Sequence, residues 1–155
     1  MNRTRRGFTM VELLVVMIVL GVLAGLAVLK YIDLRNHALA AQAGADLGTV
    51  RLAAYSAWYE TGSWPADAAP GVLPTELKPY LPGGFSFQRA EYTLDWENFV
   101  PPGGGPSAGM QLGVVLTASS ARLSNALVQM LGNKGPFVMN GSDLIFIIVG
   151  PDGRS

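Results

Sequence analysis

Few side chains in this 155-residue sequence could carry out acid, base or metal chemistry. There is no cysteine, and the one histidine, His37, falls on the solvated part of a predicted helix, so sites that need a thiol or two imidazoles are excluded. Glu91, Asp95 and Glu97 could bind calcium together with nearby carbonyls, but they lack EF-hand spacing, and a solvated strand face is the favoured interpretation. We therefore expect a protein that is not an enzyme and that holds no metal or other cofactor.

Glu12 has the most unusual surroundings of the charged residues. It is the single charge in the apolar segment of residues 8–29, and these 22 residues would form a helix about 33 Å long, enough to cross the roughly 30 Å hydrocarbon core of a bilayer. A carboxylate inside such a segment costs about 3 kcal/mol even on lenient insertion scales and is a functional residue by default. The sequence therefore predicts one membrane-spanning helix with a functional glutamate near its start.

Three arginines precede this segment, and no acidic residue lies among residues 1–7. Positive residues beside a membrane helix stay in the cytoplasm, so we expect the remainder of the chain on the outer side. A secretory signal cut near Ala27 and a plain membrane anchor are two alternative interpretations of the segment. Both leave Glu12 unexplained.

The residues around Glu12 read GFTMVE at positions 7–12, with basic residues before them and LLVVMIVLGVLAGLA after them. This pattern resembles the class III signal of type IV pilins and of the pseudopilins of type II secretion. The resemblance implies that a prepilin peptidase and N-methyltransferase cuts between Gly7 and Phe8 and then methylates Phe8. It also implies that Glu12 is the glutamate that this family uses for filament assembly.

The same resemblance implies where the protein resides and what it contacts. It implies a single-pass protein of the bacterial inner membrane, with a cytoplasmic N-terminus and a periplasmic globular domain, that enters a periplasmic or extracellular filament after assembly. Besides the peptidase and the lipid bilayer, the implied partners are copies of itself, other pilins or pseudopilins, and an inner-membrane assembly platform. No nucleic-acid partner is expected, because 11 basic and 11 acidic residues give a formal net charge of zero.

The charge of Glu12 has a physical use in this setting. Cleavage would create a positive amine on Phe8, one helical turn before Glu12, and opposite charges attract strongly where the dielectric constant is low. The Glu12 carboxylate could neutralise the Phe8 amine of a neighbouring subunit, or the pair could form within one subunit. Gly21 and Gly25 have the GxxxG spacing that permits close helix packing in membranes, although generic membrane helices show it too.

The distribution of proline determines which elements can position these residues. All ten prolines lie at Pro65 or later, so the part before Pro65 can form one long helix, from Phe8 to about Glu60. From Lys30 onward the pattern becomes amphipathic. One face is predicted to be apolar and consists of Ile32, Leu39, Ala43, Leu47, Val50, Ala54 and Trp58. Another is predicted to be polar and consists of Gln42, Asp46, Thr49, Ser56 and Glu60.

In the part of the chain that contains the prolines, the sequence predicts short helices and strands. We expect a helical turn near residues 75–80, a hairpin of residues 85–88 with 92–96, a strand at 111–117, a helix at 119–131, and strands at 137–139 and 144–149 around an Asn140-Gly141 turn. The predicted fold class is α+β, with a long N-terminal helical spine packed against a small antiparallel sheet and one additional helix. The expected organisation is a leader (1–7), a transmembrane and assembly helix (8–29), its amphipathic continuation (30–62) and a globular pilin-like β domain (63–155).

The leading hypothesis is a structural subunit of a pilus-like filament. The missing disulfide and the absence of proline from the long helix favour a pseudopilin or minor pilin, which would prime assembly in type II secretion. A membrane-anchored monomeric ligand-binding module and a secreted enzyme with a cleaved signal remain as alternatives from other functional classes.

Overall fold

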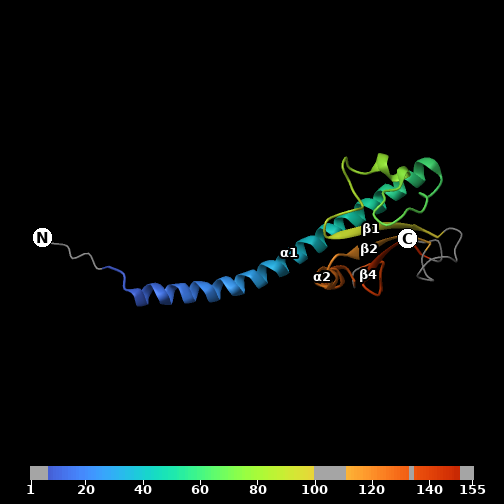
Figure 1. The fold of residues 1–155 in the computed structure, drawn as a ribbon. Coiled ribbons are helices and arrows are strands. Elements are labelled where there is room, and N and C mark those ends of the chain that lie inside the picture. The colour runs from blue at the N-terminus through green and yellow to red at the C-terminus, as the bar shows by residue number, and fades with distance from the viewer. Residues whose placement is uncertain (1–6, 100–110, 133–134, 151–155) are drawn as a thin grey trace. The chain divides into compact units, whose positions relative to one another are not determined.

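The computed structural model describes residues 7–99, 111–132 and 135–150 (Figure 1). The chain divides into two compact units, Met1–Arg35 and Asn36–Ser155. Helix α1 (Met10–Thr61) runs through both units as 52 helical residues. The predicted long helix is therefore confirmed, with its start at Met10 and its end at Thr61, before Gly62, whose φ is +71°.

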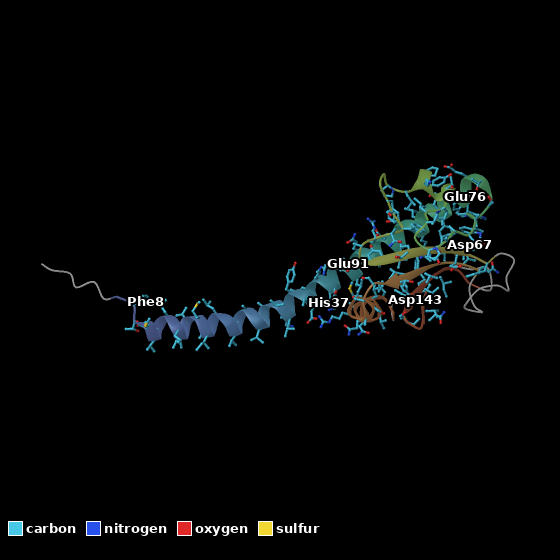
Figure 2. The ribbon with its side chains drawn as sticks, viewed as in Figure 1. Phe8, His37, Asp67, Glu76, Glu91 and Asp143 are labelled. Carbon is cyan, nitrogen blue, oxygen red and sulfur yellow. The ribbon has the colours of Figure 1, made fainter. Side chains whose placement is uncertain are left out.

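The part of α1 in the first unit has no buried side. Every residue from Met10 to Tyr31 is exposed, and in Figure 2 the side chains project from the helix in several directions. Among the described residues, α1 is the one helix that is long and apolar enough to cross a membrane, with a mean hydropathy of 2.8 in its most apolar stretch. A helix that is apolar all round requires lipid or other helices around it.

The second unit contains the sheet. Strands β1 (Tyr92–Asn98), β2 (Leu112–Ala118), β3 (Phe137–Asn140) and β4 (Asp143–Val149) form a four-stranded antiparallel sheet in the order β1-β2-β4-β3. A 3₁₀ helix, η1 (Thr75–Tyr80), precedes the sheet, and helix α2 (Ala121–Leu131) follows β2. Residues 36–61 of α1 pack on this sheet, so the predicted α+β class is confirmed.

One hydrophobic core joins α1, the sheet and α2. The buried residues of α1 are Ala40, Ala43, Leu47, Val50, Ala53, Ala54 and Ala57. They share a cluster with Leu94, Trp96 and Leu116 of the strands and with Leu123 and Leu127 of α2. Five of the seven buried α1 residues are alanines, and their small side chains let the sheet approach the helix closely.

The apolar face predicted for α1 is largely confirmed, but the prediction that Trp58 belongs to it is wrong. Its side chain is 38% exposed, because successive helical residues are 100° apart and Ala57 takes the buried position. The Trp58 ring stacks instead on Trp64, with the ring centroids 5.5 Å apart.

The first predicted hairpin is also wrong, because residues 85–88 do not form a strand. Gln88 makes only an isolated bridge to Thr93, and the Leu94 N–H donates to the Phe87 carbonyl at 2.9 Å. From the preceding loop, the Gly71 N–H donates to the Leu94 carbonyl at 2.9 Å. Loop backbone therefore covers the outer edge of β1.

The second predicted hairpin is confirmed, although its turn is one residue further along. Asn140 pairs with Asp143, so the two central residues are Gly141 and Ser142. Gly141 has a φ of +63°, and Ser142 does not have a positive φ. This combination is that of a type II′ turn, which needs glycine at its first central position.

Candidate functional site

The start of α1 carries a compact set of polar contacts. The Glu12 Oε2 atom accepts a hydrogen bond from the Thr9 N–H at 2.8 Å and another from the Thr9 hydroxyl at 2.9 Å. The Glu12 N–H donates back to Thr9 Oγ1 at 3.2 Å. Reciprocal bonding of this kind is a capping box, in which Thr9 is the N-cap and Glu12 satisfies a backbone donor that the helix leaves free.

The capping box was not predicted from the sequence, although its signal was present. A threonine followed three residues later by glutamate, just before an apolar run, is the usual signature. The sequence-based prediction for Glu12 rested only on its charge in an apolar segment. The structure adds that this charge has a partner in its own chain before any second subunit is present.

The predicted cleavage position lies immediately before the capping box. Gly7 and Phe8 precede the first helical residue, and both are exposed, Phe8 by 76%. Figure 2 labels Phe8 at the start of the helix. The peptide bond between them therefore lies in non-helical, accessible backbone, which a protease can engage. Cleavage here and methylation of Phe8 remain predictions.

Residues 2–28 match the family model of the prokaryotic N-terminal methylation motif. The chain carries the type IV pilin and pseudopilin signature. This signature, which covers residues 2–28, supports processing by prepilin peptidase, and together with the exposed apolar helix it supports membrane anchoring. No curated protein sequence and no solved structure matches the chain.

Gly21 and Gly25, the two glycines that the methylation motif places inside α1, have open space around them. A Cβ atom added at Gly21 or at Gly25 would meet nothing within 4 Å, and both residues lie in regular helix. Glycine is therefore not needed for the fold at either position. The face that they form is open to another helix, and their packing role stays a prediction.

The second unit exposes a further uncharged surface, which we name the outer face of α1. It lies opposite the buried face and consists of Ala38, Ala41, Ala45, Gly48, Leu52 and Tyr59. Leu52 is 70% exposed and Tyr59 is 79% exposed. The spacings of three, four and seven residues place all six on one side of the helix. A polar face was predicted for α1, but this uncharged face beside it was not.

Asp46 was predicted to lie on the polar face of α1, and it lies at the centre of a polar contact with the second unit's loop and sheet. Its Oδ2 atom accepts from the Tyr92 hydroxyl at 2.6 Å and forms an ion pair with Arg89 Nη2 at 3.0 Å, and its side chain is only 13% exposed. Burial and the Asp46 carboxylate together raise the pKa of Tyr92 above its usual range. The contact fixes α1 to the beginning of β1.

The three acidic residues considered for calcium do not come together. Among the described residues, no three histidine, cysteine or acidic side chains form a group that could hold a metal ion. Glu91 accepts a hydrogen bond from the Ser119 hydroxyl at 3.4 Å. Asp67 lies near Asp95 and Glu97, and Figure 2 shows Glu91 well separated from Asp67.

Asp95 and Glu97 are half-buried, so the predicted solvated strand face is wrong for them. Burial, then the nearby Asp67 carboxylate, raises the pKa of Asp95 to about 6. Burial, then Asp95 and Asp67, raises the pKa of Glu97 to about 7. The Asp95 Oδ1 atom is buried without a hydrogen-bond partner. These carboxyl groups therefore hold protons more readily than solvated ones. His37, by contrast, is exposed as predicted.

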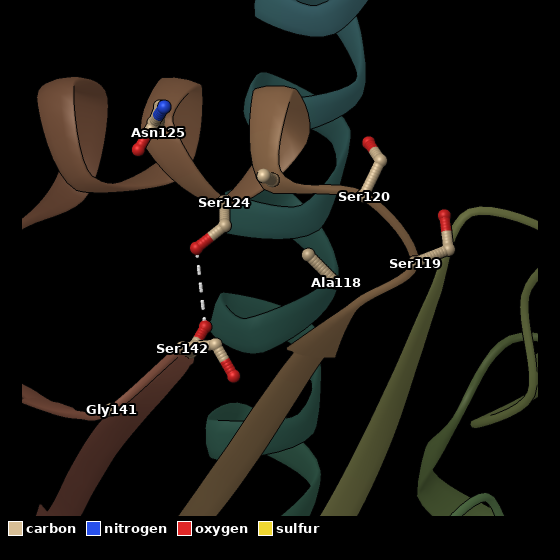
Figure 3. Close-up of a pocket in the computed structure, with 8 residues that line it drawn as sticks. Ala118, Ser119, Ser120, Ser124, Asn125, Gly141 and Ser142 are labelled. Atoms are coloured by element: carbon tan, nitrogen blue, oxygen red, sulfur yellow. Dashed lines mark hydrogen bonds between the residues drawn. The ribbon is translucent and has the colours of Figure 1, made fainter.

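An open hollow of about 500 Å³ lies between the start of α2 and the turn joining β3 to β4 (Figure 3). Its lining is neutral and consists of Ala118, Ser119, Ser120, Ala121, Ser124, Asn125, Gly141 and Ser142. The Ser124 hydroxyl donates to the Ser142 carbonyl across it at 3.1 Å. No carboxylate, imidazole or amine lines the hollow, so its residues offer hydrogen bonds rather than acid-base chemistry.

Proposed function

We propose that this protein is a structural subunit of a type IV pilus-like filament, as a pilin or pseudopilin, and not an enzyme. The observation that carries the proposal is the N-terminal methylation motif at residues 2–28, placed on an exposed apolar helix that contains Glu12. Prepilin peptidase cleaves between Gly7 and Phe8 and methylates Phe8. An inner-membrane assembly platform then polymerises the subunit through α1.

Before assembly, the subunit resides in the membrane. The arginines of residues 1–7 stay on the cytoplasmic side, the apolar part of α1 spans the bilayer, and the second unit lies in the periplasm. Removal of the leader leaves Phe8 with a positive amine close to the Glu12 carboxylate. Two opposite charges in a low-dielectric environment each need a partner, so pairing the amine of one subunit with Glu12 of the next sets the axial register between helices.

The outer face of α1 supports the same proposal. A soluble domain normally exposes charged residues on the solvent side of a surface helix, but the six residues of this face carry no charge. Small residues at three- and four-residue spacing allow another helix to approach closely. A monomeric ligand-binding module requires neither this face nor Glu12.

Mass spectrometry of the mature N-terminus tests the processing step. We expect a chain that begins with N-methylated Phe8. A chain that begins after Ala27, or that keeps residues 1–7, would contradict the proposal.

Substitution of Glu12 tests the assembly step. We expect Glu12→Leu to be inserted and cleaved normally but to yield no filaments, because the Phe8 amine then lacks its partner. Asp33→Leu is a matched control, because it also removes a carboxylate from α1, and it is expected to assemble. Normal filaments from Glu12→Leu would favour the monomeric module.

A further inference from the structure

We propose that residues 65–71, which we name the strap, cover the outer edge of β1 in a proton-dependent way. The strap stays closed while Asp95 or Glu97 holds a proton, and it opens more often once both carboxyl groups are ionised. The evidence is a set of hydrogen bonds between the strap and β1, beside a group of carboxyls. This device belongs to the folded second unit and does not depend on the filament function.

The strap occupies the edge of β1 that β2 does not pair. The Ala68 N–H donates to the Trp96 carbonyl at 3.4 Å, and the Gly71 N–H donates to the Leu94 carbonyl at 2.9 Å. On the core side, the Trp96 indole N–H donates to the Pro65 carbonyl at 3.1 Å. The strap therefore takes the place of a neighbouring strand along this edge.

The carboxyl group of Asp67 brings a negative charge to the same edge. Its Oδ1 atom accepts a hydrogen bond from the Asn98 N–H at 3.2 Å. Asp95 and Glu97 lie on one face of β1, because side chains alternate along a strand, and a side-chain hydrogen bond joins them. Two carboxyl groups can form such a bond only when at least one of them is protonated.

The other surroundings of this carboxyl pair are uncharged. Val115 and Gly113 are its partners on β2, and residues 100–110, which follow β1, contain no charged residue. Asp46 of α1 contacts the start of β1 from the core face and has its own ion pair. Among the described residues, the outside charge that acts on the pair is therefore that of Asp67, and no basic group compensates it.

Ionisation of the pair places three negative charges beside the strap. Burial, then Asp67, raises the pKa of Asp95 to about 6, and burial, then Asp95 and Asp67, raises the pKa of Glu97 to about 7. As the pH rises through this range both groups become charged, and the repulsion falls when Asp67 moves away with the strap. An open strap exposes edge groups of β1 that a strand of another chain can pair with.

Amide hydrogen exchange of the detergent-solubilised full chain at pH 5 and pH 8 tests the proposal. Each rate is divided into the intrinsic rate at that pH, which gives a protection factor. The Ala68 and Gly71 amides report the strap. The Val115 amide reports unfolding of the whole domain, because β2 is paired on both sides.

Three variants accompany the natural chain. Asp67→Asn keeps an oxygen acceptor on the strap and removes its charge. The double variant Asp95→Asn and Glu97→Gln removes the titrating pair and leaves the strap unchanged. Glu76→Gln is the matched control, because it neutralises an exposed carboxylate of η1 that is not one of the charges acting on the pair.

We expect the protection factors of Ala68 and Gly71 to lie well below that of Val115 at both pH values, because the strap opens without unfolding of the domain. They should fall about fivefold from pH 5 to pH 8, since one pKa unit of interaction is a factor of about ten and solvent screens part of it. Glu76→Gln should show the same fall. In Asp67→Asn and in the double variant the fall should be about twofold or less.

Three results would overturn the proposal. Strap amides that are protected as well as Val115 would mean that the strap opens only when the whole domain unfolds. Equal strap protection at pH 5 and pH 8 would mean that protons do not control it. A fivefold fall that persists in Asp67→Asn or in the double variant would assign the pH dependence to other groups.

Discussion

The two ends of α1 have the same backbone geometry but opposite relations to the rest of the chain. From Met10 to Leu29 every residue is exposed, and 15 of these 20 residues are large and apolar. From Ala40 to Ala57 one face is buried under the sheet, and that face is mostly alanine. The first region must find its apolar partners outside the chain, in lipid or in other subunits, whereas the second obtains them from its own domain.

The comparison separates the residues that fold the protein from those that assemble it. The buried face of α1 and the strands hold the second unit together without any residue of the methylation motif. Substitutions in one region should therefore affect stability, and substitutions in the other should affect assembly.

The largest effect on stability is expected for Trp96→Ala. Trp96 is fully buried, and its indole N–H donates to the Pro65 carbonyl at 3.1 Å, so truncation should cost about 3–5 kcal/mol of unfolding free energy. Trp58→Ala is the matched control, because Trp58 is 38% exposed, and it should cost about 1 kcal/mol. Both are measured by thermal unfolding of the detergent-solubilised chain.

Processing of the Trp96→Ala variant tests whether the two regions of α1 act independently. If the two regions are independent, the variant keeps normal cleavage after Gly7 despite its unstable domain. A precursor that is no longer cleaved would show instead that processing depends on the folded domain, and would break the separation proposed above.

A smaller effect, on assembly alone, is expected for Leu52→Glu. Leu52 is 70% exposed, so a charge there should change the unfolding free energy by no more than about 0.5 kcal/mol. If the outer face of α1 packs against another subunit, burying that charge should lower the filament yield about tenfold. Gln129→Glu adds a charge at an exposed position of α2 and should assemble normally. Equal filament yields from Leu52→Glu and Gln129→Glu would mean that the outer face of α1 does not take part in assembly.

The smallest effect is a dependence of stability on pH. The pKa values of Asp95 and Glu97 are raised in the folded domain to about 6 and about 7, so the folded state binds more protons than the unfolded state between about pH 4 and pH 7. Stability should therefore fall as the pH rises through this range. Because both groups are partly solvated, the total is about 1 kcal/mol, or roughly 3 °C in Tm between pH 5 and pH 8.

The double variant Asp95→Asn and Glu97→Gln checks the origin of this pH dependence. It should have the same Tm at both pH values, because neither amide side chain titrates. A Tm that still falls with rising pH in the double variant would assign the effect to other groups.

The elements with long-range sequence signals were predicted well. The proline-free apolar run identified α1, and runs of apolar and β-branched residues identified strands β1, β2, β3 and β4. Patterns of this kind depend on many residues at once, so a single unusual side chain does not change the result.

The errors concern contacts that only the tertiary structure decides. Asp46 was assigned to the polar face of the helix with no partner, because its partners, Arg89 and Tyr92, lie more than forty positions along the chain. The backbone near Phe87 looked like a strand, but it runs along β1 with only single hydrogen bonds to it. Thr9 was different, because its capping signal was local and was overlooked beside the charge of Glu12.

The covered edge of β1 limits how these domains can associate. An unpaired strand edge is a template for another strand, and crowded proteins with open edges aggregate through it. Here the Gly71 N–H and the Phe87 carbonyl occupy the outer edge of β1, and β3, at the other side of the sheet, has only four residues. The covered edge and the short edge therefore leave the folded domain little backbone to pair with a strand of another copy. In the proposed filament, contacts between subunits would come from α1 and not from added strands.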